Sequence, residues 1–175
     1  MIGCGGVGLS AIMTGRALGA EIVAVDLDDR ALGRARRLGA DRTVDVSGLP
    51  PDDARDAVRA ATGGDGASVA VEAIGNESAL ALGIRSLRRH GTLVQVGLFA
   101  REPRVPVPDM IARELRLVGS HGMAAAGYPA MMEMVADGRL RPERLVSRRI
   151  SLDEAPAALA GLDGPAADGV AVITF

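Results

Sequence analysis

The sequence has a single cysteine, only two histidines and no lysine, so all 20 of its basic residues are arginines. One cysteine excludes an intrachain disulfide and any metal site built on a Cys-X-X-Cys pair, which favours an intracellular protein. The exclusive use of arginine, beside many alanines and glycines, is more typical of a coding bias than of a particular function.

Long apolar runs are also missing. No stretch approaches the roughly 20 apolar residues that a membrane-spanning helix needs. The N-terminus has no basic region, and glycines interrupt its apolar residues, so it does not have the pattern of a secretory signal. We therefore expect a cytoplasmic protein with no membrane partner.

Charge of one sign does not dominate the chain. The formal net charge is -2, from 20 basic and 22 acidic residues dispersed along 175 positions. Because nucleic-acid-binding proteins usually carry a basic patch, no nucleic-acid partner is expected. With 48% hydrophobic residues, the chain can bury a sizeable core, and one compact domain is the default expectation.

The sequence begins with a glycine-rich stretch that leads directly into an apolar run. This stretch is Met1-Ile2-Gly3-Cys4-Gly5-Gly6-Val7-Gly8. In this GxGGxG pattern Gly3 permits a tight turn, Gly5 lets the backbone approach a pyrophosphate, and Gly8 lets a helix pack close to a sheet. The N-terminus of that helix offers free N–H groups and a positive dipole end to an anion. The pattern predicts a nucleotide-binding loop, although such glycines also occur in simple turns.

The start of the chain is unusual for such a loop. A phosphate loop normally follows a complete strand of about five residues, whereas only Met1 and Ile2 precede Gly3. We therefore expect the first, central strand of the sheet to be largely truncated, and cofactor binding to be weaker than with an intact strand.

An acid follows at the spacing that the loop requires. A helix is predicted over 7–18, stopped by Gly19, and a β-branched strand over 21–25 ends at Asp26. A carboxylate at the end of this second strand accepts hydrogen bonds from an adenosine ribose, and it repels the 2'-phosphate of NADP, so NAD is favoured. The alternative interpretation is a helix cap or a solvated loop acid, since Asp28 and Asp29 are neighbours.

The remaining chain continues the alternation of strand and helix. Further strands are predicted at 43–46, 67–72, 91–97, 115–119 and 170–175, and helices at 28–38, 50–61, 77–87, 109–114, 128–137 and 152–162. The proline-rich segment 101–108 is predicted to be an extended surface connection. The methionines of 128–137 are expected to be core residues. This order indicates an α/β fold with a doubly wound, mostly parallel sheet of the Rossmann type.

The ordered blocks GCGGVGLSAIMTGRALGAEIVAVDLDD, VEAIGN, GTLVQVGL and SLDEAPAALAGL resemble the cofactor-binding part of medium-chain zinc-type alcohol dehydrogenases. The resemblance covers nearly the whole chain. It implies a dinucleotide-binding Rossmann domain over 1–150, and a C-terminal helix and strand over 151–175 that in the family pack back toward a catalytic domain.

The resemblance also implies which residues bind NAD. The backbone of Gly5, Gly6 and Val7, within the loop from Gly3 to Gly8, holds the pyrophosphate, and Asp26 with Leu27 holds the adenosine ribose. The remaining contacts would lie along the second ribose and the nicotinamide: Ala73, Ile74, Gly75, Val96, Gly97 and Leu98. Ser120 and His121 would meet the carboxamide group of the nicotinamide. All of these positions follow predicted strands, where open α/β sheets bind their ligands.

In the family, a hydride moves between the nicotinamide and a small alcohol or carbonyl substrate whose oxygen is polarised by zinc. The zinc ligands belong to an N-terminal catalytic domain that this sequence does not contain. Cys4, His90 and His121 form no pattern that builds a zinc site, so no metal ligand and no catalytic residue is predicted. We expect Cys4 to be a small buried residue, His90 to be structural at the end of a helix, and the chain to be inactive alone.

Two other functions remain open from the sequence. A methyltransferase that binds S-adenosylmethionine also uses a glycine-rich loop and an acid after the second strand, but VEAIGN and GTLVQVGL disfavour it. A non-catalytic nucleotide-binding module would bind NAD without turnover. Quinone reductases of the same superfamily work without zinc, yet they favour NADPH, which Asp26 opposes. The resemblance further implies a possible homo-oligomer through the edge of the sheet.

Overall fold

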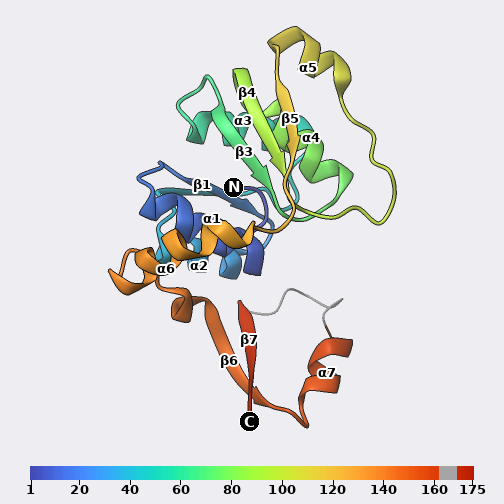
Figure 1. Ribbon diagram of the computed structural model, residues 1–175. Helices are drawn as coiled ribbons and strands as arrows, with labels where there is room; N and C mark the ends of the chain where they lie inside the picture. Colours follow the sequence, from blue (N-terminus) through green and yellow to red (C-terminus); the bar gives the residue numbers. More distant parts are fainter. Residues whose placement is uncertain (162–168) are drawn as a thin grey trace.

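The computed structural model describes residues 1–161 and 169–175. Helices and parallel strands alternate along the chain (Figure 1). The helices are α1 (Gly6–Ala17), α2 (Asp29–Leu38), α3 (Pro51–Ala61), α4 (Glu77–Arg85), α5 (Val107–Arg113), α6 (Tyr128–Ala136) and α7 (Ala155–Ala160), with 3-10 turns η1 (Ala125–Gly127) and η2 (Pro142–Leu145). The strands are β1 (Val23–Asp26), β2 (Arg42–Asp45), β3 (Ala67–Glu72), β4 (Leu87–Gln95), β5 (Arg116–Gly119), β6 (Val146–Ser151) and β7 (Val170–Thr174).

The main sheet consists of two parallel ladders that meet at the N-terminus. β1 pairs with β2 in one ladder, and β3, β4 and β5 follow one another in the other. Ile2 forms parallel bridges to Val25 and to Glu72, and Met1–Gly3 share backbone hydrogen bonds with both ladders. The order β2, β1, Met1–Gly3, β3, β4, β5 is the doubly wound order expected from the sequence, and its central strand is reduced to this short segment.

Helices cover both faces of the sheet, and β1 buries apolar side chains on both, with Ala24 on one side and Val23 and Val25 on the other. On one face α1, α2 and α6 pack together around Leu9, Ile12 and Leu32. On the other face α3 contributes Val58, and α4 contributes residues that include Leu80. Figure 1 shows α1, α2 and α6 gathered on the same side of the sheet. This two-sided covering confirms the predicted fold class.

The short central segment leaves a groove of about 780 Å³ between β1 and β3. Val23 and Val69 line it from the two strands, while Ile12 and Val58 line it from the helices on the two faces. The Met1 amine donates a hydrogen bond to the Val23 carbonyl at 2.7 Å, as the N–H of a continuing strand would. A cavity with strand edges on two sides and apolar helical residues on the others has the dimensions of a buried strand.

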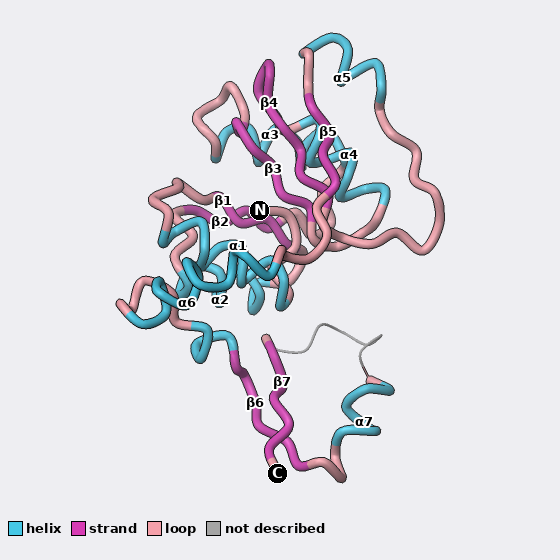
Figure 2. Tube along the Cα trace, viewed as in Figure 1, coloured by secondary structure: helices cyan, strands magenta, loops and turns pink. Residues whose placement is uncertain are grey.

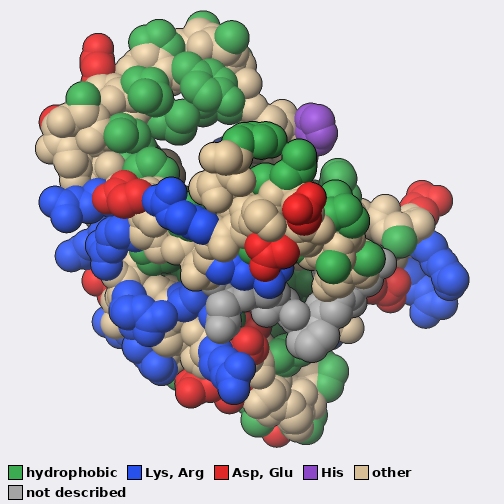
Figure 3. Space-filling view, turned by 90° about the horizontal axis from the view of Figure 1, so that it is seen from below, with side chains coloured by type: hydrophobic (Ala, Val, Ile, Leu, Met, Phe, Trp, Pro, Cys, Tyr) green, Lys and Arg blue, Asp and Glu red, His purple; other side chains and the backbone are tan. Residues whose placement is uncertain are grey.

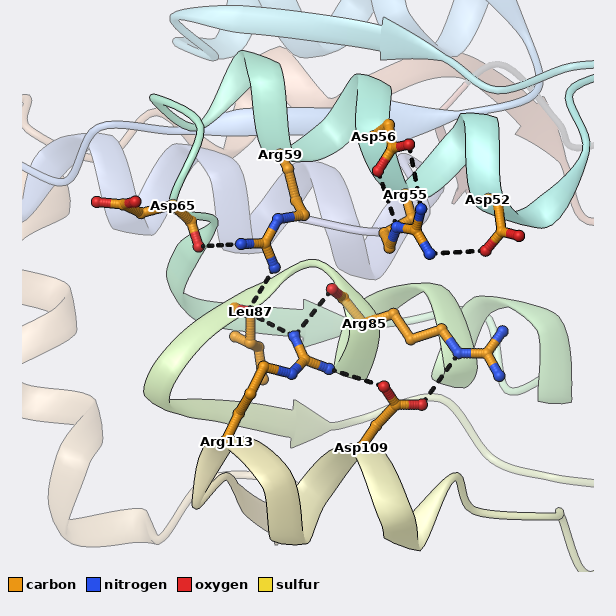
Figure 4. Close-up of polar contacts among 9 residues, drawn as sticks. All are labelled: Asp52, Arg55, Asp56, Arg59, Asp65, Arg85, Leu87, Asp109 and Arg113. Carbon is orange, nitrogen blue, oxygen red and sulfur yellow. Dashed lines mark hydrogen bonds and ion pairs between the residues drawn. The ribbon is translucent and has the colours of Figure 1, made fainter.

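The C-terminal end of α4 is held by two arginines from neighbouring helices (Figure 4). Arg113 of α5 donates to the carbonyls of Arg85 at 3.0 Å and Leu87 at 2.8 Å, and it also pairs with Asp109. Arg59 of α3 donates to the Leu87 carbonyl at 3.4 Å. Since the last carbonyls of a helix have no intrahelical donors, Arg113 satisfies that of Arg85. Both arginines also meet at the Leu87 carbonyl, where β4 begins, and so join α3 and α5 at this point.

The last strands form a separate small sheet that extends away from the main one (Figure 2). β6 pairs in parallel with β7, from Val146 opposite Val170 to Ser151 opposite Thr174. β6 was not predicted, and it spans position 150, the expected domain boundary. α7 covers a shorter range than the predicted 152–162, whose last residue lies outside the described part of the chain.

Two boundaries from the sequence need correction. The helix predicted to end at residue 87 ends at Arg85, and the strand predicted from 91 begins at Leu87. His90 therefore does not end a helix. It has a positive φ of 60° within β4, and its Nδ1 atom lies 3.5 Å from the Glu114 carboxylate.

Charges of both signs share the molecular surface, as the dispersed acidic and basic residues predicted. Figure 3 shows blue and red side chains close together on one face, and Arg55 forms ion pairs with Asp52 and Asp56 on α3. Within residues 1–161 and 169–175, no helix combines the length and the apolar character that crossing a bilayer requires.

In a chain that begins at Met1, the free amine makes stability depend on pH. Burial lowers the pKa of this amine from 8.0 to about 6, because an ammonium group loses its hydration in the groove. Between these pKa values the unfolded amine binds a proton and the folded amine does not, so stability is lost as the pH falls. The free energy of unfolding is expected to decrease by about 1–2 kcal/mol from pH 8 to pH 6.

Urea unfolding at a series of pH values measures this effect. The control is the same chain with an acetylated N-terminus, which has no amine to protonate. An equal decrease in the acetylated chain would assign the pH dependence to other groups.

Candidate cofactor site

The glycine-rich loop has the geometry that its sequence predicts. Gly3 has a φ of +87°, and a Cβ atom on Gly3 would lie 2.5 Å from Ile74 Cγ1. A Cβ atom on Gly8 would lie 1.8 Å from the Gly3 carbonyl oxygen, so only glycine allows α1 to start this close to the loop. At Gly5, by contrast, an added Cβ atom meets nothing within 4 Å. The loop is therefore packed closely against the rest of the protein at Gly3 and Gly8, and it is open at Gly5.

Helix α1 begins at Gly6 without a side-chain cap on Gly5. The first N–H groups of a helix have no intrahelical acceptor, and no acidic residue lies in this first turn. Free N–H groups at the positive end of the helix dipole suit a phosphate. The described structure thus fits a pyrophosphate along Gly5, Gly6 and Val7.

Asp26 connects the end of β1 to the loop. One of its carboxylate oxygens accepts a hydrogen bond from the Cys4 N–H at 2.6 Å, and the other accepts from Leu27 N–H at 2.7 Å and Asp28 N–H at 3.1 Å. The cap of α2 comes instead from Asp28, which accepts from Arg30 N–H. The carboxylate of Asp26 is partly exposed and stands beside the loop, where it can also accept from the hydroxyl groups of a ribose.

Cys4 is fully buried beneath the loop. Burial, together with the negative charge of Asp26, raises the pKa of the Cys4 thiol to about 12. A thiol that stays protonated is neither a nucleophile nor a ready metal ligand. The expectation of a small buried residue is confirmed.

The loops after β3 and β4 pack backbone against backbone. Gly75 has a φ of +85°, and a Cβ atom there would lie 2.1 Å from the Leu98 carbonyl oxygen. A Cβ atom on Gly97 would lie 2.2 Å from the Gly75 nitrogen. Glycine is thus required at both positions, and the segments Ala73–Gly75 and Val96–Leu98 form one surface.

The predicted positions after the last strand of the main sheet lie at the same edge. Ser120 follows β5 and donates its N–H to the Gln95 carbonyl at 2.9 Å, next to the start of the loop after β4. His121 is exposed. The carboxyl ends of the parallel strands therefore bring all the predicted loops to one side of the sheet.

Apolar side chains are exposed among these loops. Val7, Leu27, Ile74 and Leu98 have exposed fractions of 56%, 65%, 46% and 79%. Large apolar side chains at a loop edge can pack against the flat faces of an adenine or a nicotinamide ring.

Three residues that were not predicted from the sequence also shape this edge. Glu72 and Gln95, the last residues of β3 and β4, hold the two packed loops together. An acid that ends an otherwise apolar strand was the available signal for Glu72. Val170 of β7 approaches the glycine-rich loop, since a Cβ atom on Gly6 would lie 3.5 Å from its Cγ2 atom.

The side chains of the described residues do not fit a zinc site. In the described residues, no group of three or more His, Cys, Asp or Glu side chains is arranged to hold a metal. Cys4 is buried with a raised pKa, and His90 contacts Glu114 away from the loops. These residues therefore offer no ligand set for a zinc ion.

The strand order, the tight loop before α1 and the acid after β1 define a Rossmann-type cofactor-binding domain. Residues 6–137 match the family model described as zinc-binding dehydrogenase, and the chain belongs to this family. It is the cofactor-binding part, because the chain spans about half the length of the curated relatives that it matches.

Three similar proteins illustrate the match. An NAD-dependent alcohol dehydrogenase from Sulfurisphaera tokodaii is 29% identical over 97% of this chain and 48% of its own length. The crystal structure of 2R,3R-butanediol dehydrogenase from Bacillus subtilis has a TM-score of 0.86 and 28% identity, over 99% of this chain and 49% of that one. A putative zinc-binding dehydrogenase from Sinorhizobium meliloti bound to NADP has a TM-score of 0.79 and 28% identity, over 98% of this chain and 50% of that one.

Proposed function

We propose that this chain is the NAD-binding part of a zinc-type dehydrogenase that transfers a hydride between the nicotinamide and a small alcohol or carbonyl compound. When bound, the nicotinamide supplies the hydride donor or acceptor. The residues of this chain bind and orient it, and the groups that activate the substrate oxygen belong to the rest of such an enzyme. Alone, the chain is expected to bind the cofactor without turnover.

The observation that carries this proposal is the open side of the glycine-rich loop beside Asp26. Gly5 leaves space where a diphosphate would lie, and the N-terminus of α1 provides the donors. Asp26 is fixed next to these donors by its bond from Cys4 N–H. An anion site and a ribose acceptor within one loop match the ADP half of a dinucleotide.

Asp26 also supports NAD over NADP. Its carboxylate would lie close to the 2'-phosphate of NADP, and two negative groups at this distance repel each other. One similar protein binds NADP, so cofactor choice has to be measured on this chain. Replacing Asp26 with asparagine is expected to reduce the preference for NAD at least tenfold, because the repulsion disappears.

Isothermal titration calorimetry with NAD, ADP-ribose, NADP and S-adenosylmethionine tests the proposal. We expect NAD and ADP-ribose to bind, NADP to bind at least tenfold more weakly, and S-adenosylmethionine not to bind. Binding of S-adenosylmethionine without NAD would instead support a methyltransferase. Turnover of a simple alcohol by the purified chain would overturn the expectation that it is inactive alone.

The proposal extends to subunit pairing and to domain organisation. β5 is an edge strand whose four residues are all exposed, and an exposed strand edge can pair with a second copy of the chain. Residues 1–150 are proposed to form the cofactor domain, and 151–175 to pack toward a catalytic domain. Sedimentation velocity with and without a Leu117→Pro substitution, which removes an N–H that faces away from β4, tests the subunit contact.

A further inference from the structure

Glu72 is a buried acid that the proposed binding of NAD does not explain. It is the last residue of β3, it has no solvent exposure, and it lies beneath the loops rather than among the exposed groups. A buried carboxyl group costs free energy unless hydrogen bonds satisfy it. Its partners therefore show what it stabilises.

Both carboxylate oxygens of Glu72 accept hydrogen bonds from the loops at the site. One oxygen accepts from Ile74 N–H at 2.8 Å and Gly75 N–H at 2.9 Å. The other accepts from Gly75 N–H at 3.1 Å and from the side-chain amide of Gln95. These donors suit a carboxylate, which can only accept.

Gln95 carries the connection to the second loop. Its Nε2 atom donates to Glu72 and also to the Gly97 carbonyl at 2.8 Å. The Glu72 carbonyl in turn accepts from Val96 N–H at 2.9 Å and Gly97 N–H at 3.0 Å. Side chain and backbone of Glu72 thus fix the loop after β3 and the loop after β4 to each other.

These two loops are distinct from the elements that would bind the ADP half of the cofactor. That half lies along Gly5, Gly6, Val7 and Asp26, which belong to α1 and the ladder of β1 and β2. The loops fixed by Glu72 belong to the ladder of β3, β4 and β5. The two parts of the site can therefore be measured separately.

We infer that Glu72, acting through Gln95, is a positioning residue for the nicotinamide half of the cofactor. The inference rests on the proposed function, and it adds a residue whose side chain is buried below the ligand. Glu72→Gln keeps the shape but replaces one accepting oxygen with an NH₂ group, which would face the N–H groups of Gly75 or Gln95. The two loops then lose their common side-chain acceptor, and of the bonds from Glu72 only those of its backbone carbonyl still reach the loop after β4.

Comparing NADH with ADP, which lacks the second ribose, tests this inference. Glu72→Gln is expected to weaken NADH binding at least tenfold and to abolish the change in nicotinamide fluorescence on binding, while ADP affinity stays within about threefold. The chain has no tryptophan, so tryptophan emission does not interfere with the NADH signal. The matched control is Glu133→Gln, which changes an exposed glutamate on α6 and should alter neither ligand.

The outcomes separate the inference from the proposed function. If the unaltered chain binds neither NADH nor ADP, the proposed function fails. If it binds both and Glu72→Gln leaves the NADH affinity and fluorescence unchanged, or weakens both ligands equally, the positioning role is refuted. Should Glu72→Gln not fold, Gln95→Met removes the amide link to Gly97 and must show the same selective loss of NADH.

Discussion

Replacing Gly8 with alanine is expected to destabilise the protein by about 2–3 kcal/mol and to abolish NAD binding. The new Cβ atom would lie 1.8 Å from the Gly3 carbonyl oxygen, so α1 has to move away from the loop. Alanine gains about 1 kcal/mol over glycine within a helix, but a clash with the backbone costs more than this gain. Urea unfolding and calorimetric titration with NAD measure the two effects.

Gly5→Ala is the matched control, because the same methyl group is added three residues earlier. Gly5 has a φ of -75°, which alanine adopts easily, and the added atom meets nothing within 4 Å. Stability is expected to change by less than about 1 kcal/mol, while NAD affinity falls at least tenfold because the methyl group occupies the open side of the loop. Normal NAD binding by Gly5→Ala would show that the pyrophosphate lies elsewhere.

Extending the chain before Met1 with about five apolar, β-branched residues is expected to stabilise it by about 3 kcal/mol. The extension would fill the groove of about 780 Å³ between β1 and β3 and would pair with both strand edges. For a chain of this size, the melting temperature should then rise by roughly 6–12 °C. NAD affinity should also increase, because a complete strand anchors the loop that starts at Gly3.

An extension of the same length with prolines at alternate positions is the control for this experiment. Proline cannot donate the backbone hydrogen bonds that a central strand makes, so this chain should melt at the temperature of the original. Equal stabilisation by both extensions would show that the groove does not accept a strand. A stable extended chain with unchanged NAD affinity would separate the fold from the proposed loop anchoring.

Local signals made several parts of the fold predictable from sequence. Asp28 caps α2 through its own side chain, and Gly39 ends that helix with a φ of +114°, because both depend on neighbouring residues alone. The glycine spacing before α1 was equally informative. A methyl group at Gly3 or Gly8 would meet other atoms, and these are the positions that the loop pattern requires.

Contacts between distant residues explain what the sequence did not reveal. The early start of β4 depends on Leu87 pairing with Ala67 and on its carbonyl accepting from Arg113, which lies 26 residues away. β6 was not predicted because its residues are mostly exposed and its partner β7 comes much later in the chain. The predicted site positions gather at one edge of the sheet, but the role of Glu72 depends on Gln95, 23 residues later.

The two ladders of the main sheet are joined, in the described part of the chain, through the backbone of Met1–Gly3. The proposed ligand would contact both ladders, with its diphosphate on one and its nicotinamide on the other. A dinucleotide would then act as a cross-link between the two ladders, in addition to the buried cluster of Ile2, Val25, Val58 and Ala79 that already packs across them. ADP would bind only beside the ladder of β1 and β2 and so would still bind if the ladders separated, whereas the complete cofactor opposes that separation.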